Sequence, residues 1–290
     1  METVDARKKG VALGKRVAYS LLASRADDNF ERVDATKDEF AAGVFQQAAD
    51  RKMGINIAIT FRRPYGVASM TVFDPGPPRK PDSAVALRDV AEVQALAARM
   101  SAVRTADQTA AALFWNSGED NDSQNLFQLI ADARKFDVLD HARMMALLEI
   151  ADADVRQAYL VFKNKYRHWR PDAAITSKFA HASVRDQTWE PLIHTPGDSE
   201  YPSGGASGAG YFLAVLTYFN GDNAAKLIWK NTAINVTRTW PTAQAMTAEF
   251  ANSRVWGGAH FRTSVDAGYA LGKRVTEEVL ATQLKPLLAK

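Results

Sequence analysis

The pattern of apolar and polar positions along the chain is helical over most of its length. Residues 6–26 carry an apolar stripe at helical spacing, and the helical pattern resumes at Ser83 and continues almost to the end. The clearest segments are 83–100, 105–115, the two or more helices of 122–167, and within these 142–161. Alternation typical of strands is scarce. Residues 54–61 (GINIAITF) are the best strand candidate, and one short strand does not build a sheet.

This pattern predicts an all-α fold, a single-domain bundle of about ten helices. The proline-rich segment Asp74–Pro81 forbids a helix, so the pattern divides there. We expect residues 1–82 to form an N-terminal helix and an irregular segment packed on the core, and residues 83–290 to form that core, in one structural domain overall. Residues 10–17 and 268–275 share the sequence G-x-A-L-G-K-R-V, which indicates two helices with similar packing needs.

Composition narrows the functional classes. The chain has 36 Lys and Arg against 33 Asp and Glu, and this near balance argues against nucleic acid or an anionic membrane as a partner. The absence of cysteine excludes disulfides and thiolate chemistry. The longest apolar run, Tyr211–Phe219, is about half the length that spans a bilayer. The N-terminus lacks the apolar region of a secretory signal, which predicts a cytoplasmic protein as written, and a periplasmic or secreted one if the natural chain begins earlier.

Three segments carry candidate chemistry, and the first is residues 163–171 (KNKYRHWRP). Lys163 and Arg170 are seven positions apart, about two helical turns, which predicts that both project from one helix face together with Arg167. Pro171 would end this helix and leave Arg170 at its rim. Two fixed cations suit a tetrahedral oxyanion. The alternative interpretation is a solvated basic face on a surface helix.

The second segment is residues 201–210 (YPSGGASGAG), which runs into an apolar helix. Small residues at a helix start leave backbone N–H groups open to a phosphate-like anion, and Ser203 would add a hydroxyl. The alternative is close helix packing through Gly204 and Gly208.

The third segment is residues 253–262 (SRVWGGAHFR). The pair Gly257–Gly258 predicts a helix break, which would let Arg254 and His260 converge on one point. A structural role for a lone histidine is the alternative. Taken together, the three segments predict an oxyanion site with one nucleophilic or ligating nitrogen.

The order and spacing of these segments, K-x6-RP, PSG and SR-x5-H, resemble the signature of the type 2 phosphatidic acid phosphatase and vanadium-dependent haloperoxidase superfamily. Other stretches resemble its soluble bacterial haloperoxidase-like branch, and the similarity covers approximately residues 85–285. These stretches are Arg104–Thr109 with Phe114 and Trp115, Ala142–Asp154, and Trp189–Pro196. The resemblance implies an all-α fold built around helical bundles, and it allows a homodimer.

The resemblance also implies roles for individual residues. Lys163, Arg170 and Arg254 match the positions that neutralise the oxyanion. Ser203 and the Gly204 N–H match those that hydrogen-bond its oxygens, and His260 matches the apical ligand. In haloperoxidases this histidine binds vanadate, which takes up hydrogen peroxide and oxidises halide for transfer to an organic acceptor. Phosphate can occupy the same site, and in the phosphatases the histidine attacks a phosphate ester to form a phosphohistidine.

Two positions depart from the superfamily pattern. Gly205 stands where the PSGH histidine belongs, so the usual acid is missing, and His168 and His194 are the remaining candidates for it. The aspartate that often follows the apical histidine is Ser264 here, with Asp266 two positions further on. We therefore expect Ser264, Asp266 or a backbone carbonyl to orient His260.

The leading hypothesis is a vanadium haloperoxidase-like enzyme, because a phosphatase would depend more on the missing acid than a haloperoxidase does. The same missing acid predicts that the enzyme oxidises bromide or iodide rather than chloride. The alternatives are an acid phosphatase that favours activated aryl esters, and a non-catalytic oxyanion-binding relative.

Overall fold

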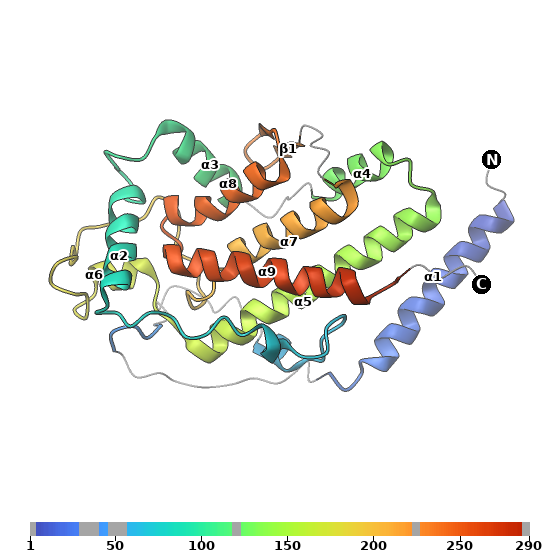
Figure 1. Ribbon diagram of the computed structural model, residues 1–290, viewed down its shortest axis with the longest axis horizontal. Coiled ribbons are helices and arrows are strands. Elements are labelled where there is room, and N and C mark those ends of the chain that lie inside the picture. The colour runs from blue at the N-terminus through green and yellow to red at the C-terminus, as the bar shows by residue number, and fades with distance from the viewer. Residues whose placement is uncertain (1–3, 29–40, 46–56, 118–122, 222–226, 286–290) are drawn as a thin grey trace.

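A computed structural model describes residues 4–28, 41–45, 57–117, 123–221 and 227–285 (Figure 1). These ranges contain nine α-helices, two short 3₁₀ helices and one two-stranded sheet, which confirms the predicted all-α class. The α-helices are α1 (Val4–Ser24), α2 (Ala84–Leu96), α3 (Ala106–Asn116), α4 (Ser123–Ala133), α5 (Val138–Tyr166), α6 (Pro171–Thr176), α7 (Gly204–Asn220), α8 (Ala243–Trp256) and α9 (Arg262–Thr282). The short elements are η1 (Ile57–Phe61), η2 (Met70–Phe73), β1 (Leu227–Asn231) and β2 (Val236–Trp240).

The centre of the molecule is formed by α5, α7 and α9, which run side by side (Figure 1). Apolar residues fill the space between them, among them Phe162 of α5, Val215 of α7 and Val275 of α9. Helices α7 and α9 approach closely because Gly272 lies directly against the backbone of Ser207, where an added Cβ would be 1.9 Å from the carbonyl oxygen. This contact brings the start of α7 beside the start of α9.

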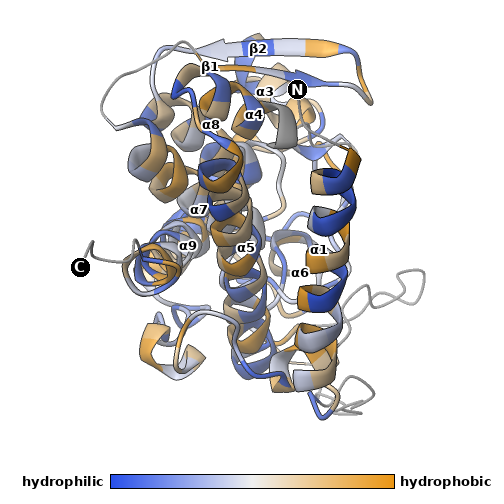
Figure 2. Cartoon of the chain, turned by 90° about the vertical axis from the view of Figure 1, so that its right-hand side faces the viewer, coloured by the Kyte–Doolittle hydropathy of each residue, from blue (hydrophilic) through white to orange (hydrophobic). Residues whose placement is uncertain are grey.

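Helix α1 differs from the rest of the molecule. The predicted helix at 6–26 is confirmed, with bounds Val4–Ser24, but all of its residues are exposed. Figure 2 shows it at the edge of the molecule. The two copies of G-x-A-L-G-K-R-V therefore do not share packing needs: Gly14 has no neighbouring atom within 4 Å, whereas Gly272 contacts α7. The division of the chain at residues 82 and 83 stays a prediction.

The strand predicted at 54–61 is wrong over its described part, because residues 57–61 form the 3₁₀ helix η1 and residues 54–56 lie outside the described ranges. A strand needs a partner for its backbone groups, and the two described strands pair only with each other, from Leu227↔Trp240 to Asn231↔Val236. This hairpin was not predicted. The proline-rich segment 74–81 contains no helix, as predicted. Among the described helices, none is long and apolar enough to cross a membrane.

Candidate active site

The first pair of cations comes from two elements rather than from one helix face. Helix α5 ends at Tyr166, and Arg167 adopts a left-handed conformation with φ 43°. Arg170 is the N-cap of α6, and Pro171 occupies its first turn, where proline fits a helix start. The predicted continuous helix from Lys163 to Arg170 is therefore wrong. The two side chains nevertheless converge, and each is only 3% exposed.

Asp198 joins these two cations through its carboxylate. Its Oδ2 lies 3.1 Å from the Lys163 Nζ, and its Oδ1 accepts a hydrogen bond from the Arg170 guanidinium. Burial alone would raise the pKa of Asp198, but Lys163 and Arg170 together hold it far below its usual range. Burial lowers the pKa of Lys163 to about 8, even though Asp198 opposes that change. Asp198 is thus a fixed negative charge that spans both cations.

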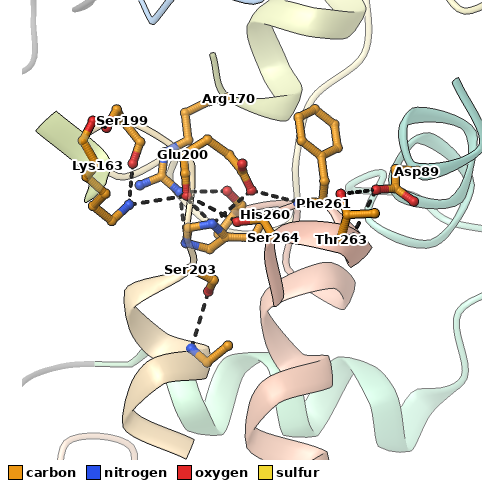
Figure 3. Close-up of polar contacts among 12 residues, drawn as sticks. Asp89, Lys163, Arg170, Ser199, Glu200, Ser203, His260, Phe261, Thr263 and Ser264 are labelled. Carbon is orange, nitrogen blue, oxygen red and sulfur yellow. Dashed lines mark hydrogen bonds and ion pairs between the residues drawn. The ribbon is translucent and has the colours of Figure 1, made fainter. Parts of the chain in front are cut away.

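His260 lies between Arg170 and a second carboxylate (Figure 3). Its Nδ1 is 3.0 Å from Glu200 Oε1, and its Nε2 is 3.0 Å from Arg170 Nη1. Burial and the surrounding cations lower the pKa of His260 well below its usual value, so the ring is neutral near pH 7. The contacts fix the tautomer: Nδ1–H donates to Glu200, and the Nε2 lone pair accepts from Arg170.

Glu200 is the residue that orients His260. Its Oε1 also accepts a hydrogen bond from the backbone N–H of Phe261 (2.9 Å), which fixes the segment that carries the histidine. Burial raises the pKa of Glu200 to about 7. Of the predicted orienting groups, neither the Ser264 nor the Asp266 side chain has a hydrogen bond to the ring among the described residues, whereas a hydrogen bond to the backbone of Glu200 raises the pKa of the ring against the larger effect of burial. Ser264 donates instead to the Glu200 carbonyl oxygen (3.3 Å), and Asp266 is exposed because it points away from the buried face of α9.

Arg254 reaches the site from the last turn of α8. That helix ends at Trp256 and Gly258 has φ 87°, so the predicted break between Arg254 and His260 is confirmed. The Arg254 Nη1 donates to the Asn116 side chain, while its Nε is buried and has no hydrogen-bond partner among the described residues. Burial, and then the charge of Arg170, lower the pKa of Arg254 to about 10, which leaves the group charged at neutral pH.

Gly205 faces the Arg254 side chain. An added Cβ at Gly205 would lie 2.7 Å from the Arg254 Nε and 2.8 Å from its Cδ. The arginine therefore fills the space in which a side chain at this position would begin. In this chain, the guanidinium of Arg254 fills the space that the histidine side chain of the superfamily pattern would need at position 205.

The start of α7 supplies neutral donors. Ser203 is the N-cap, fully buried, and its hydroxyl oxygen accepts from the Ala206 N–H (3.2 Å; Figure 3). The N–H groups of Gly204 and Gly205, in the first turn, have no acceptor within the helix. The close packing that we considered as an alternative role is carried mainly by Gly210, where an added Cβ would be 2.1 Å from the Tyr269 carbonyl oxygen.

His168 and His194 are the two candidates for the missing acid, and among the described residues neither ring has a hydrogen bond to the cations of the site or to His260. His168 is buried, its ring packs against Phe261 at 6.1 Å between centroids, and burial lowers its pKa to about 4. It is therefore neutral at pH 7. His194 is exposed.

Comparison with known proteins shows the family to which this chain belongs. The family model described as "VCPO second helical-bundle domain" matches residues 143–287, which include all six residues predicted to hold an oxyanion. The chain belongs to this vanadium haloperoxidase-like family. A search of curated proteins finds no match.

Three solved structures have the same fold. A bacterial vanadium-dependent iodoperoxidase matches with a TM-score of 0.73 and 22% sequence identity over 88% of this chain, and this chain spans only 64% of its length. A bacterial vanadium-dependent chloroperoxidase in its holo form gives 0.71 and 17% identity, covering 93% of this chain and 71% of that one. A bacterial vanadium-dependent chloroperoxidase in its apo form matches with a TM-score of 0.69 and 19% sequence identity, and the match covers 93% of this chain and 73% of that one.

Two residues of the candidate site were not predicted from the sequence. Asp198 and Glu200 lie directly before the Tyr-Pro-Ser-Gly segment, and a pair of acids so close to a proposed anion cradle was a signal that could have been used. Their effects differ, because Asp198 offsets positive charge whereas Glu200 orients the histidine. The assembled site presents three buried or half-buried cations, one neutral imidazole nitrogen and a helix N-terminus, a donor set that suits a tetrahedral oxyanion.

Proposed function

We propose that this chain holds vanadate through His260 and uses hydrogen peroxide to oxidise bromide or iodide. The observation that carries the proposal is the neutral His260 ring, whose Nδ1–H is held by Glu200 and whose Nε2 faces the buried cations. Family membership and the shared fold support it. The net reaction with bromide, H2O2 + Br− + H+ → HOBr + H2O, consumes one proton.

The residues present fit an oxyanion cofactor. The Arg254 Nε is a buried donor without a partner in the described structure, which is the state expected of a group that serves a ligand. The Asp198 carboxylate already bridges Lys163 and Arg170 with its two oxygens, so these cations are spaced to bind two oxygens of one anion. His260 would hold the vanadium through its ring nitrogen, and the first turn of α7 with Ser203 would donate to oxygens of the anion.

Vanadate, when bound, supplies the Lewis-acid centre at which peroxide is activated. The chain's own residues prepare that centre. Glu200 keeps the proton on Nδ1, so Nε2 carries a lone pair that would serve as the ligand in place of its hydrogen bond from Arg170. Lys163, Arg170 and Arg254 stabilise negative charge on the oxygens, and their burial strengthens each interaction relative to water.

The preference for bromide or iodide follows from the missing acid. Gly205 provides no proton donor, His168 is neutral and packed elsewhere, and His194 is exposed. General-acid assistance is typically worth about 10²–10⁴-fold. A site without it is expected to oxidise the more easily oxidised halides and to leave chloride unreacted.

The test is vanadate binding together with halide oxidation. We expect the wild-type chain to bind vanadate, measured by vanadium-51 NMR and calorimetry, and to brominate a phenolic dye with peroxide above background at acidic to neutral pH. His260→Ala should lose activity and bind vanadate at least about tenfold more weakly. His194→Ala, which changes an exposed histidine, is the matched control and should behave as wild type.

Other outcomes point to the alternatives. Hydrolysis of an activated aryl phosphate that vanadate inhibits and His260→Ala abolishes, without bromide oxidation, would assign the chain to phosphatase chemistry. Vanadate or phosphate binding with neither activity would identify a non-catalytic oxyanion-binding protein.

A further inference from the structure

A cavity of about 440 Å³ adjoins the candidate site and takes no part in the chemistry described so far. It is bounded by α4, α5, α7 and α8, and Gly204 and Gly205 lie in its wall. These are the two glycines at the start of α7, directly after the buried N-cap Ser203, and the Arg254 side chain lies against Gly205. A molecule in the cavity would therefore lie directly next to the reacting centre.

One stripe of α5 connects the cavity to the cations. Glu149, Asp152, Arg156 and Tyr159 line the cavity, and the next residue of the series is Lys163. Their spacing of three or four places all five on one helix face. The ring of Tyr159 lies against Gly204, where an added Cβ would be 3.1 Å away. Tyr159 thus lies in the cavity wall beside the start of α7, and burial raises its pKa, so its hydroxyl stays protonated.

Aromatic rings form the opposite wall. Phe127 of α4 stacks with Phe212 of α7 at 5.9 Å and 20°, and Phe212 lies 6.4 Å from Phe250 of α8. Planar aromatic ligands pack well against such rings, in stacked or edge-on contact. This wall is formed by residues of three helices, α4, α7 and α8.

The charge of the cavity is opposite in sign to that of the oxyanion site. Its ionisable acids and bases are Glu149, Asp152 and Arg156, and Arg156 is already paired with Asp152, with Nε 2.6 Å from Oδ2. The remaining carboxylate, Glu149, leaves a net negative charge. An aromatic anion is therefore disfavoured in the cavity, and a cationic or neutral aromatic is favoured.

We infer that this cavity binds the organic acceptor, and that the acceptor is a neutral or cationic phenol or aromatic amine. The inference rests on the proposed function for its chemical step. In the net reaction, ArH + Br− + H2O2 + H+ → ArBr + 2 H2O, a C–H bond is replaced by a C–Br bond, bromide loses two electrons and the peroxide O–O bond is cleaved by taking them up.

The test measures binding before any chemistry. Calorimetry with the whole chain in excess phosphate, which occupies the cations, compares three phenols of similar shape: tyramine (cationic), 4-propylphenol (neutral) and 3-(4-hydroxyphenyl)propionate (anionic). We expect tyramine to bind most tightly and the carboxylate about tenfold more weakly. The variant Glu149→Gln, which keeps the Arg156–Asp152 pair, should remove most of that difference.

A plug variant locates the binding site. Gly208 lines the cavity, and its added Cβ would meet Phe250 at an ordinary 3.6 Å, so Gly208→Leu extends into the cavity without a clash at its first atom. We expect Gly208→Leu to weaken all three phenols about tenfold or more while phosphate affinity is kept. Gly14→Leu, on the exposed helix α1, is the matched control and should bind as wild type.

The inference is overturned if neither tyramine nor 4-propylphenol binds saturably, if Gly208→Leu binds them as wild type does, or if the carboxylate binds most tightly in phosphate. A chain that binds tyramine as expected but does not oxidise bromide would refute the proposed function alone. A chain that oxidises bromide but brominates tyramine equally well with and without Gly208→Leu would refute the cavity's role alone.

Discussion

Two faces of helix α7 carry small residues, and they use them for different purposes. On the face toward α9, the backbone of Ser203 and Ser207 touches Gly268 and Gly272, with added Cβ atoms only 2.3 and 1.9 Å from carbonyl oxygens. On the face toward the cavity, Gly204, Gly205 and Gly208 meet side chains instead. The first face sets how closely two helices approach, whereas the second leaves room for an arginine and a ligand.

The difference follows from what can move. A carbonyl oxygen in a packed helix cannot move without its helix, so a methyl group there must separate α7 from α9. A side chain such as Arg254 can move to another rotamer while the backbone stays in place. Substitutions on the α9 face should therefore damage the fold, and substitutions on the cavity face should damage binding.

The largest effect is expected for Gly272→Ala. Its Cβ would overlap the Ser207 backbone, and overpacking of this kind costs about 3 kcal/mol or more of the free energy of unfolding. Thermal unfolding followed by circular dichroism should show a midpoint lowered by about 5–10 °C. Gly14→Ala is the control, because Gly14 is the corresponding residue in the other copy of the motif, residues 10–17. Gly14 has open space, so its substitution should be neutral or stabilising by up to about 1 kcal/mol. Equal midpoints for Gly272→Ala and wild type would contradict this account of the α9 face.

The next effect is on binding, for Gly205→Ala. The methyl group would displace the Arg254 guanidinium from its position 2.7 Å away, and loss of one charged donor should weaken phosphate or vanadate binding about 10- to 100-fold. The unfolding midpoint should change little. Gly208→Ala, whose Cβ meets only Phe250 at 3.6 Å, adds the same methyl group three residues later and should keep wild-type affinity. If the two variants bind phosphate equally, Arg254 does not depend on Gly205.

The contact between Arg254 and Gly205 also changes the effect expected of the substitution Gly205→His. The sequence alone indicates a missing acid that a substitution would restore. In the structure, Arg254 occupies the space next to Gly205, so Gly205→His would have to move a cation of the site before it could add an acid. In the Gly205→His variant, the added acid would favour chloride oxidation, whereas the displaced arginine would weaken oxyanion binding.

The sequence predicts this site unevenly, for identifiable reasons. Arg170 could be selected because it precedes Pro171, and Lys163 because it lies seven positions before Arg170. Arg254 and His260 could be selected because they flank the Gly257–Gly258 break. Their convergence from four elements depends on the Arg167 turn and on the start of α6, which local periodicity does not reveal. Glu200 was missed because its partner is sixty positions away.

The fold shows a similar limit. The helices were predictable because each has its own apolar periodicity, whereas the β1–β2 hairpin is short and its pairing is set by contacts outside it. The motif shared by residues 10–17 and 268–275 is the clearest case. Identical residues lie in a buried interface in α9 and on an exposed helix in α1, because burial depends on the neighbours that the rest of the chain provides.

The smallest effect is expected for Asp198→Asn, which changes the charge next to the cavity face of α7 without changing its shape. Asp198 pairs with Lys163 and Arg170, so it competes with an incoming oxyanion for both cations. Its replacement should strengthen binding of sulfate, whose charge is constant near neutral pH, by about three- to fivefold at pH 6. Asp266→Asn, at an exposed carboxylate, is the control and should leave affinity unchanged.

The gain in sulfate affinity of Asp198→Asn should also depend on pH. Burial lowers the pKa of Lys163 to about 8, and Asp198 opposes that change, so removing Asp198 should lower the pKa further. At pH 6, below the pKa of about 8, Lys163 of the wild type is charged, and we expect the variant to show its largest gain in affinity at this acidic end. As the pH rises toward 9, Lys163 of the variant loses its proton first, so the advantage should shrink or reverse. An advantage that stays constant from pH 6 to pH 9 would show that Lys163 does not hold the oxyanion, and that Arg170 and Arg254 bind it without the lysine.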